Sequence, residues 1–203
     1  MDCANCDDKE CYQGKDCTKI KEKIISAYNE DSRMLEMARM GTYLEGNYYM
    51  QLTRLEELIV FAKKMDFKKV GIAFCIGLSA EVKTLDAIMS EYFKTYSACC
   101  KVCGINKEIF GFDKIDGSRF EAMCNPAGQA AVLNNVGTDL NIIFGLCIGH
   151  DIIFSKNSDA PVTTLLVKDR VLAHNPCGSI YSGYYRKRIG SRIEKITGVK
   201  QND

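Results

Sequence analysis

The pattern of apolar and polar positions changes near residue 68. From 18 to 66, apolar residues recur every three or four positions, which predicts helices. Gly41 and Gly46 are expected to interrupt this helical part before a clearer helix from about 48 to 65, because glycine disfavours a helix interior. Beyond residue 68, short apolar runs alternate with helical stretches. The chain is therefore expected to place a helical segment before an α/β domain.

Four short apolar runs predict buried strands. Helical stretches separate them, and such alternation favours a mostly parallel sheet with helices on both faces. A further helix with an apolar face is expected at the C-terminus. The predicted strands are 70–76, 95–102, the run within 141–151 (NIIFGLCIGHD) and 162–167.

Length and charge limit the classes of function. The 203 residues suit one α/β domain over 18–203 with a small segment, 1–17, in front of it. A net charge of +1 indicates neither a nucleic-acid partner nor an anionic membrane surface, and the short basic cluster 186–188 is expected to be a solvated helix face. The longest apolar run is shorter than the roughly 20 residues of a membrane span, and no secretory signal is visible. We expect a cytoplasmic protein.

Eleven cysteines are the unusual feature of the composition. An odd number of closely spaced thiols without a secretory signal argues against a secreted disulfide framework. Reduced thiols, several of them metal ligands, are the better interpretation. Cysteine also packs well as a small core residue, and we expect that role for Cys103 and Cys177.

The first seventeen residues concentrate four of the cysteines among polar neighbours. Such a segment cannot build a core, so a bound ion or cluster would have to supply the free energy that orders it. The spacing Cys-x2-Cys-x4-Cys-x5-Cys matches neither a zinc ribbon nor the bacterial ferredoxin motif. A disordered thiol-rich tail is the alternative to a metal or iron–sulfur site. The expected ligands are Cys3, Cys6, Cys11 and Cys17.

A second group of cysteines follows the predicted strands. Ligand sites in open α/β sheets lie at the carboxyl ends of the strands, where these cysteines would meet. Cys99 and Cys100 are adjacent in a strand, so their side chains point to opposite faces and only one is expected to line a cleft. The alternative is that these thiols simply pack in the core. The second predicted ligand set is Cys75, Cys100, Cys124 and Cys147, with His150 as a further ligand or a hydrogen-bond donor behind the ligands.

Cys147 and His150 could instead form a nucleophile–base pair. Against this, no carboxylate other than Asp139 and Asp151 is evident to orient the histidine. His174, beside an Asn-Pro turn, is expected to be a hydrogen-bonded turn residue. The glycine pattern contains neither a dinucleotide fingerprint nor a P-loop.

Several motifs resemble one family along nearly the whole chain. They are the N-terminal cysteines, IAFCIGL, SACCKV, CNPAGQA, TDLNIIFGLCIGHD, APVTTLLVKDRVLAHNP and a final YY pair. The chain is similar to a family of uncharacterised, cysteine-rich predicted metal-binding proteins of archaea and anaerobic bacteria. The resemblance implies metal binding without naming a metal or a reaction. It supports the four N-terminal cysteines and, in the body, Cys75, Cys99, Cys100, Cys124 and Cys147.

Three functional hypotheses follow. The first is a cytoplasmic iron–sulfur protein, with a 4Fe-4S cluster as the expected cofactor, that acts in electron transfer or in redox or sulfur chemistry on a small molecule. Its partner would be a redox protein or a small-molecule substrate. The second is a non-enzymatic binding or regulatory module stapled by zinc. The third is a thiol enzyme in which Cys147 attacks and His150 moves the proton.

Overall fold

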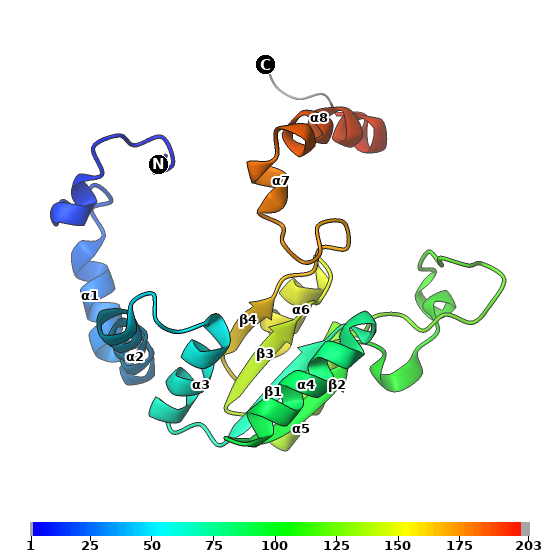
Figure 1. Ribbon diagram of the computed structural model, residues 1–203, viewed down its shortest axis with the longest axis horizontal. Coiled ribbons are helices and arrows are strands. Elements are labelled where there is room, and N and C mark those ends of the chain that lie inside the picture. Colours follow the sequence, from blue (N-terminus) through cyan, green and yellow to red (C-terminus); the bar gives the residue numbers. More distant parts are fainter. Residues whose placement is uncertain (1, 200–203) are drawn as a thin grey trace. The chain divides into compact units, whose positions relative to one another are not determined.

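The computed structural model describes residues 2–199, and its contacts group the chain into two units that meet in sequence at Thr53 and Arg54. The first unit holds a 3-10 turn and two helices (Figure 1). Residues 2–20 contain no buried side chain, in keeping with their polar composition. The elements of this unit are η1 (Glu10–Gln13), α1 (Lys21–Glu30) and α2 (Ser32–Tyr48).

Helix α2 continues through both glycines, so the expected interruption at Gly41 and Gly46 is wrong. The helix begins with a strong cap, because the Asp31 side chain accepts a hydrogen bond from the backbone N–H of Met34 at 2.9 Å. Each glycine costs about 1 kcal/mol relative to alanine in a helix interior, which seventeen capped residues tolerate.

The second unit is an α/β domain around a four-stranded, entirely parallel sheet, as the alternating pattern predicted (Figure 1). The strand order is β2-β1-β3-β4. Its strands are β1 (Lys69–Phe74), β2 (Lys94–Cys99), β3 (Leu140–Phe144) and β4 (Val162–Leu166). Its helices are α3 (Arg54–Lys64), α4 (Ser79–Ser90), α5 (Pro126–Val136), α6 (His150–Asn157), α7 (Gly178–Tyr181) and α8 (Gly183–Thr197), with 3-10 turns η2 (Ile76–Leu78), η3 (Val102–Gly104) and η4 (Lys107–Phe110).

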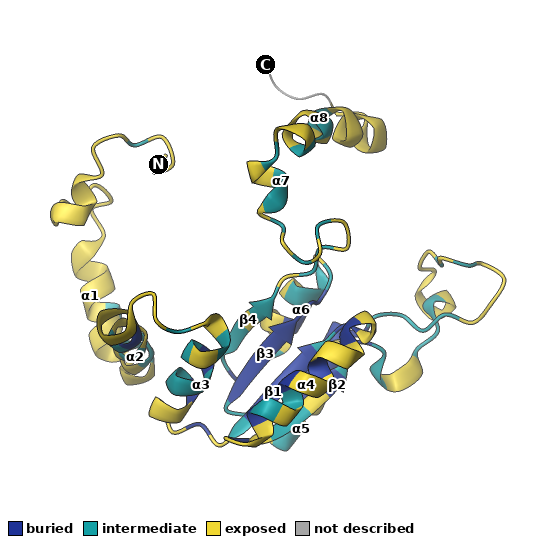
Figure 2. Cartoon of the chain, viewed as in Figure 1, coloured by how far each residue is buried: buried dark blue, intermediate teal, exposed yellow. Residues whose placement is uncertain are grey.

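Two apolar cores cover the two faces of the sheet, because successive residues of a strand point to opposite sides. Val70 and Ile72 of β1 pack in the core that also contains residues of α3 and α4. Ala73 follows Ile72, points to the opposite face and packs in the second core, with residues of α5 and α6. The dark central strands in Figure 2 reflect this double burial.

Glycine at position 71 allows a helix to approach the sheet closely. A Cβ added there would clash with the side chains of Asn141 and Leu133. Asn141 is itself fully buried, where its amide donates to Ser158 Oγ at 2.8 Å and its oxygen accepts from Thr138 Oγ1 at 2.8 Å. Close packing of α5 against β1 therefore depends on the absence of a Cβ atom at Gly71.

The strand order creates a crevice at one edge of the sheet. From β1 the chain passes to β2 on one side and later reaches β3 on the other, so the connections after β1 and β3 diverge. In open α/β sheets this switch point, outside the carboxyl ends of the strands, is where ligands bind. Gln129 of α5 stabilises the edge: its fully buried side-chain amide donates to the carbonyl oxygens of Phe74 at 3.1 Å and Ala98 at 2.6 Å.

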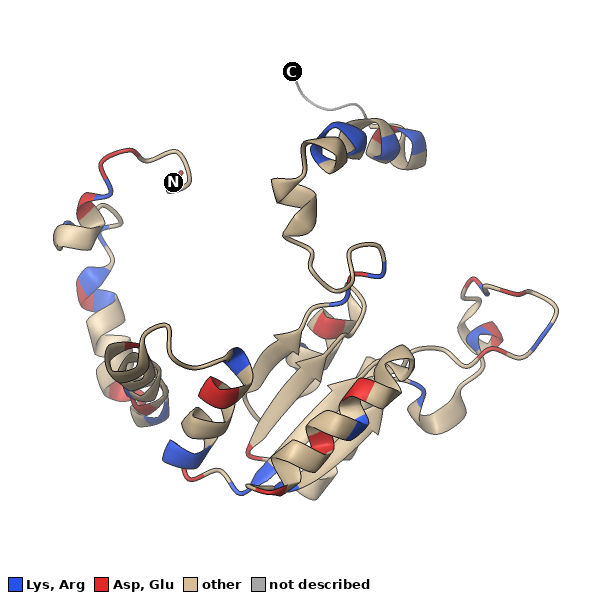
Figure 3. Ribbon diagram, viewed as in Figure 1, with Lys and Arg blue, Asp and Glu red and all other residues tan. Residues whose placement is uncertain are grey.

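Basic residues concentrate on the last helix, α8 (Figure 3). Arg186 and Lys187 are exposed, as a solvated helix face requires, while Arg188 stacks over the rings of Tyr184 and Tyr185. Among residues 2–199, no helix has the length and apolar character needed to cross a membrane.

Candidate functional site

A cavity of about 780 Å³ lies at the carboxyl edge of the sheet, and four cysteines line it. They come from three connections, with Cys100 and Cys124 near the two ends of the one between β2 and α5. Cys75 follows β1, Cys100 follows β2, Cys147 follows β3, and Cys124 lies two residues before α5. Cys99, the last residue of β2, is not on the cavity wall, so the parallel sheet brings together the four cysteines of the second predicted ligand set.

Backbone hydrogen bonds beyond the strands hold these cysteines in place. The N–H of Cys75 donates to Phe144 O at 3.3 Å, and the N–H of Cys100 donates to Phe74 O at 2.8 Å. The N–H of Asn125 donates to Cys100 O at 2.7 Å, which ties the start of α5 to the end of β2. The ladder thus continues past β1 and β2 into the cysteine-bearing turns.

Three of the four thiols lie beside a basic side chain. Lys168 Nζ is 3.4 Å from Cys75 Sγ, Lys101 Nζ is 3.5 Å from Cys124 Sγ, and an Arg170 guanidinium nitrogen is 3.1 Å from Cys147 Sγ. The fourth sulfur, that of Cys100, is buried and accepts the backbone N–H of Ile76 at 3.4 Å. Adjacent cations favour the thiolate form of cysteine.

Cys100 and Cys124 form a thiol–thiolate pair. A hydrogen bond from Cys100 lowers the pKa of Cys124 to about 5, and the nearby charges of Lys101 and His150 act in the same direction. The same hydrogen bond to Cys124, together with burial, raises the pKa of Cys100 far above its usual value. Cys124 is therefore the thiolate of the pair at neutral pH, and Cys100 keeps its proton.

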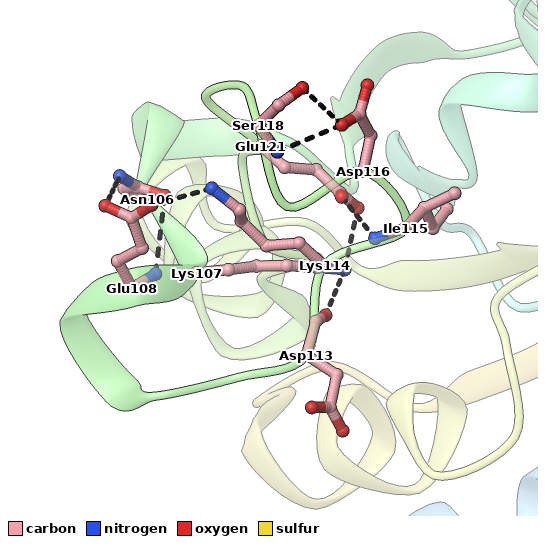
Figure 4. A network of polar contacts seen from close by, with 9 residues as sticks. All are labelled: Asn106, Lys107, Glu108, Asp113, Lys114, Ile115, Asp116, Ser118 and Glu121. Carbon is pink, nitrogen blue, oxygen red and sulfur yellow. Dashed lines mark hydrogen bonds and ion pairs between the residues drawn. The ribbon is translucent and has the colours of Figure 1, made fainter.

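The loop 105–123 forms the outer wall of the cavity. An antiparallel bridge between Asn106 and Ala122 closes it at its base. Lys107 and Glu121 add a half-buried ion pair at 2.7 Å, and Figure 4 shows the surrounding network of charged side chains. This loop presents apolar side chains to the cavity, namely Phe112, Ile115, Phe120 and Met123.

The N-terminal cysteines lie in a different setting. Cys6 is half-buried and its thiol donates to Asp8 Oδ1 at 3.2 Å, whereas Cys3, Cys11 and Cys17 are exposed. All eleven cysteines of the chain are free thiols. Within residues 2–199, no group of three or more histidine, cysteine, aspartate or glutamate side chains has the arrangement of a metal-ion site. Metal binding by either cysteine set stays a prediction.

The two cysteines expected to pack in the core, Cys103 and Cys177, are both exposed, so that expectation is wrong. Both lie in turns: Cys103 has a φ of 69° within η3, and Cys177 precedes α7. Because these turns lie at the surface, neither cysteine side chain packs in the core.

The two histidines have different surroundings. His150 lines the cavity, and its backbone N–H donates to Cys147 O at 2.9 Å. Among the hydrogen bonds of the described residues, none joins the His150 ring to the Cys147 sulfur, so the nucleophile–base hypothesis gains no support from this geometry. His174 is a turn residue as predicted, since its Nδ1 accepts the backbone N–H of Asp169 at 3.2 Å.

The sequence interpretation missed the basic residues of the site. Lys101 directly follows Cys100, and Lys168 and Arg170 follow β4 by two and four residues. Their shared position just beyond strand ends was an available signal, since parallel strands deliver such residues to the same edge as the cysteines. The apolar loop residues carried no comparable signal, because the loop's fold depends on ion pairs between residues far apart in it.

Comparison with known proteins places the chain in a family. Residues 12–165, more than half of the chain, match the model of the family DUF1847, which is described as a protein of unknown function. The chain belongs to the DUF1847 family. An uncharacterised protein of Methanocaldococcus jannaschii is 57% identical over 190 residues, which cover 93% of this chain and 98% of that relative. No solved structure matches the DUF1847 chain. The matched region includes all four cavity cysteines but begins after Cys3, Cys6 and Cys11.

Proposed function

We propose that the cysteine-lined cavity binds an iron–sulfur cluster through Cys75, Cys100, Cys124 and Cys147, and that the protein transfers electrons or performs redox or sulfur chemistry on a small molecule. The observation that carries this proposal is the convergence of four thiols, from the three connections that follow β1, β2 and β3, on one cavity at the switch point. Bound there, a cluster would supply one-electron transfer.

The donor set fits a cluster better than a single ion. Soft thiolates are the ligands of iron–sulfur clusters and also of zinc. A single zinc ion would need all four sulfurs gathered around one point at about 2.3 Å. A cluster distributes its four ligands over several iron atoms, so it suits thiols spread around a cavity wall.

The charges around the cavity also favour this proposal. A cluster with four thiolate ligands carries net negative charge, and the surrounding protein tunes its potential through charge and hydrogen bonds. Lys101, Lys168 and Arg170 each lie within hydrogen-bonding distance of a different cysteine sulfur. These cations would offset the charge of the cluster and make its reduction easier.

For the N-terminal segment we propose a second metal site, with Cys3, Cys6, Cys11 and Cys17 as ligands. Its support is the sequence, which places four thiols in a segment without a buried residue. Because nothing in residues 2–17 is buried, a metal would have to supply the free energy that orders this segment. Zinc bound here as a structural staple is the alternative to a second cluster.

The adjacent cysteines at the end of β2, Cys99 and Cys100, provide the test. The chain is purified without oxygen and analysed for iron, acid-labile sulfide and zinc in three forms: wild type, Cys100→Ser and Cys99→Ser. Cys100 lies on the cavity wall and Cys99 does not, so Cys100→Ser should lose the iron and sulfide of the cavity cluster while Cys99→Ser keeps the wild-type content. Equal iron and sulfide in the two variants, or a colourless wild-type protein that contains only zinc, would refute the iron–sulfur proposal.

A further inference from the structure

We infer that the same cavity also binds a small molecule that joins one negatively charged group to an apolar portion. The four cysteines and Arg170 line it beyond the ends of the strands, and the loop 105–123 supplies most of its apolar lining. The role of this ligand as the substrate of a redox cluster rests on the proposed function. Its binding, however, depends on side chains that are present whether or not iron is bound.

The cavity has room for more than its cysteines. Its volume of about 780 Å³ lies within the range of small-molecule sites, roughly 300–1,000 Å³. The loop 105–123 lines the cavity without any cysteine or histidine, mostly with apolar and basic side chains. A ligand could therefore occupy this part of the cavity beside the thiols.

The charge of the wall selects an anion. Four basic side chains line the cavity against two anionic groups: the Cys124 thiolate, 3.5 Å from Lys101 Nζ, and the Glu121 carboxylate, which is paired with Lys107 at 2.7 Å. Arg119 is paired with Asp116 at 3.1 Å. Among the described residues, the one side-chain hydrogen bond of Arg170 goes to Cys147, and a guanidinium has five N–H donors. Arg170 thus keeps donors for a carboxylate or a similar anion.

The loop accounts for the apolar portion. Phe112, Ile115 and Phe120 line the cavity yet are at least half exposed, at 50%, 92% and 64%. Exposed apolar side chains around a cavity, held by a folded and ion-paired loop, are typical of a ligand site and not of scattered surface residues. A ligand with an apolar portion would cover them.

The test uses three probes that separate the two halves of the ligand: phenylacetate, acetate and benzyl alcohol. Binding is measured by calorimetry on the full chain, both as purified without oxygen and after removal of metal with a chelator under reducing conditions. Phenylacetate should bind about tenfold or more tightly than either of the others, because only it uses both the cation and the apolar wall. The preference should persist in the metal-free protein.

Two matched pairs of variants assign the binding to this cavity. Ile115→Ser removes an apolar side chain from the cavity wall, whereas Ile109→Ser makes the same change on an exposed part of the same loop that does not line the cavity. The first should weaken phenylacetate binding about fivefold and the second should not change it. Arg170→Gln should abolish the preference for phenylacetate over benzyl alcohol, and Arg192→Gln on the exposed part of α8 should leave it intact.

The outcomes separate this inference from the proposed function. Selective phenylacetate binding without iron in the purified protein would support the ligand class and refute the cluster. Equal binding of the three probes, or equal effects of Ile115→Ser and Ile109→Ser, would overturn the ligand class. If the protein then still contained iron and sulfide, the cluster proposal would stand.

Discussion

Gln129 holds the carboxyl ends of β1 and β2 together, and its replacement tests whether α5 organises the edge of the sheet. Its fully buried amide donates to Phe74 O and Ala98 O, the carbonyls that precede Cys75 and Cys99. Its own carbonyl oxygen, Oε1, has no hydrogen-bond partner among the described residues. All of the side chain's polar stabilisation therefore comes from the two N–H groups.

The Gln129→Leu variant loses both hydrogen bonds while keeping most of the side-chain volume. Each bond contributes about 1 kcal/mol net, and Phe74 O retains its bond from the Cys100 N–H, so the unfolding free energy should fall by about 2 kcal/mol. For a chain of this length the midpoint of thermal unfolding should drop by about 4–8 °C. Gln51→Leu, at an exposed position in the first unit, is the control and should be within about 0.5 kcal/mol of wild type.

The Gln129→Glu variant adds a pH dependence. An ionised carboxylate would face two carbonyl oxygens in a buried site, so the folded protein should hold the carboxyl group protonated and raise its pKa. The pKa of this carboxyl group would be about 4.3 in the unfolded chain and higher in the folded protein. Between these two pKa values, the unfolding free energy of the variant should fall by about 1.4 kcal/mol per pH unit as the pH rises. Urea unfolding at pH 5 and pH 8 should therefore show a larger deficit at pH 8 for this variant than for Gln129→Leu. Unfolding free energies within about 0.5 kcal/mol of wild type for both variants would refute the reasoning.

Three further predictions concern the site and the packing around it. In the metal-free, reduced protein, alkylation of Cys124 should be nearly independent of pH between 6 and 8, because its pKa of about 5 keeps it a thiolate. Free cysteine in solution, with a pKa of about 8.5, is the control and should react faster as pH rises; parallel pH profiles of the two, followed by mass spectrometry, would contradict the thiolate assignment. Gly71→Ala should destabilise the fold by about 1–3 kcal/mol through overpacking, while Gly41→Ala in the open interior of α2 should stabilise it by about 0.5–1 kcal/mol. Denaturant titrations measure both changes, and equal effects of the two variants would rule out the close packing at residue 71. Lys107→Met should speed proteolytic cleavage within 105–123, since it removes the ion pair that holds the loop; an unchanged rate would show that the loop does not depend on that pair.

The sequence was sufficient for the architecture because the two central strands, β1 and β3, are buried on both faces. Their continuous apolar runs, alternating with helical periods, led to a parallel sheet, and parallel strands must bring cysteines such as Cys75 and Cys147 to one edge. The opposite directions of neighbouring side chains in a strand also separate Cys100 from Cys99 without any knowledge of the packing.

Other features depend on contacts between distant residues and could not be read from local patterns. Helix α2 continues through Gly41 because its cap and length outweigh a local propensity. The contacts of Lys168 with Cys75 and of Arg170 with Cys147 span 93 and 23 residues. The low pKa of Cys124 depends on its neighbour Cys100, which no spacing rule would have paired with it.

The central claim is that the body cysteines hold an iron–sulfur cluster of their own, whichever metal the N-terminal cysteines bind. It is tested most directly by replacing Cys3, Cys6, Cys11 and Cys17 together with serine, purifying the protein without oxygen, and measuring iron and acid-labile sulfide per chain. We predict that this variant keeps iron and sulfide in equal amounts, and that adding Cys100→Ser removes both. A folded variant with four N-terminal serines but without iron and sulfide would contradict the claim.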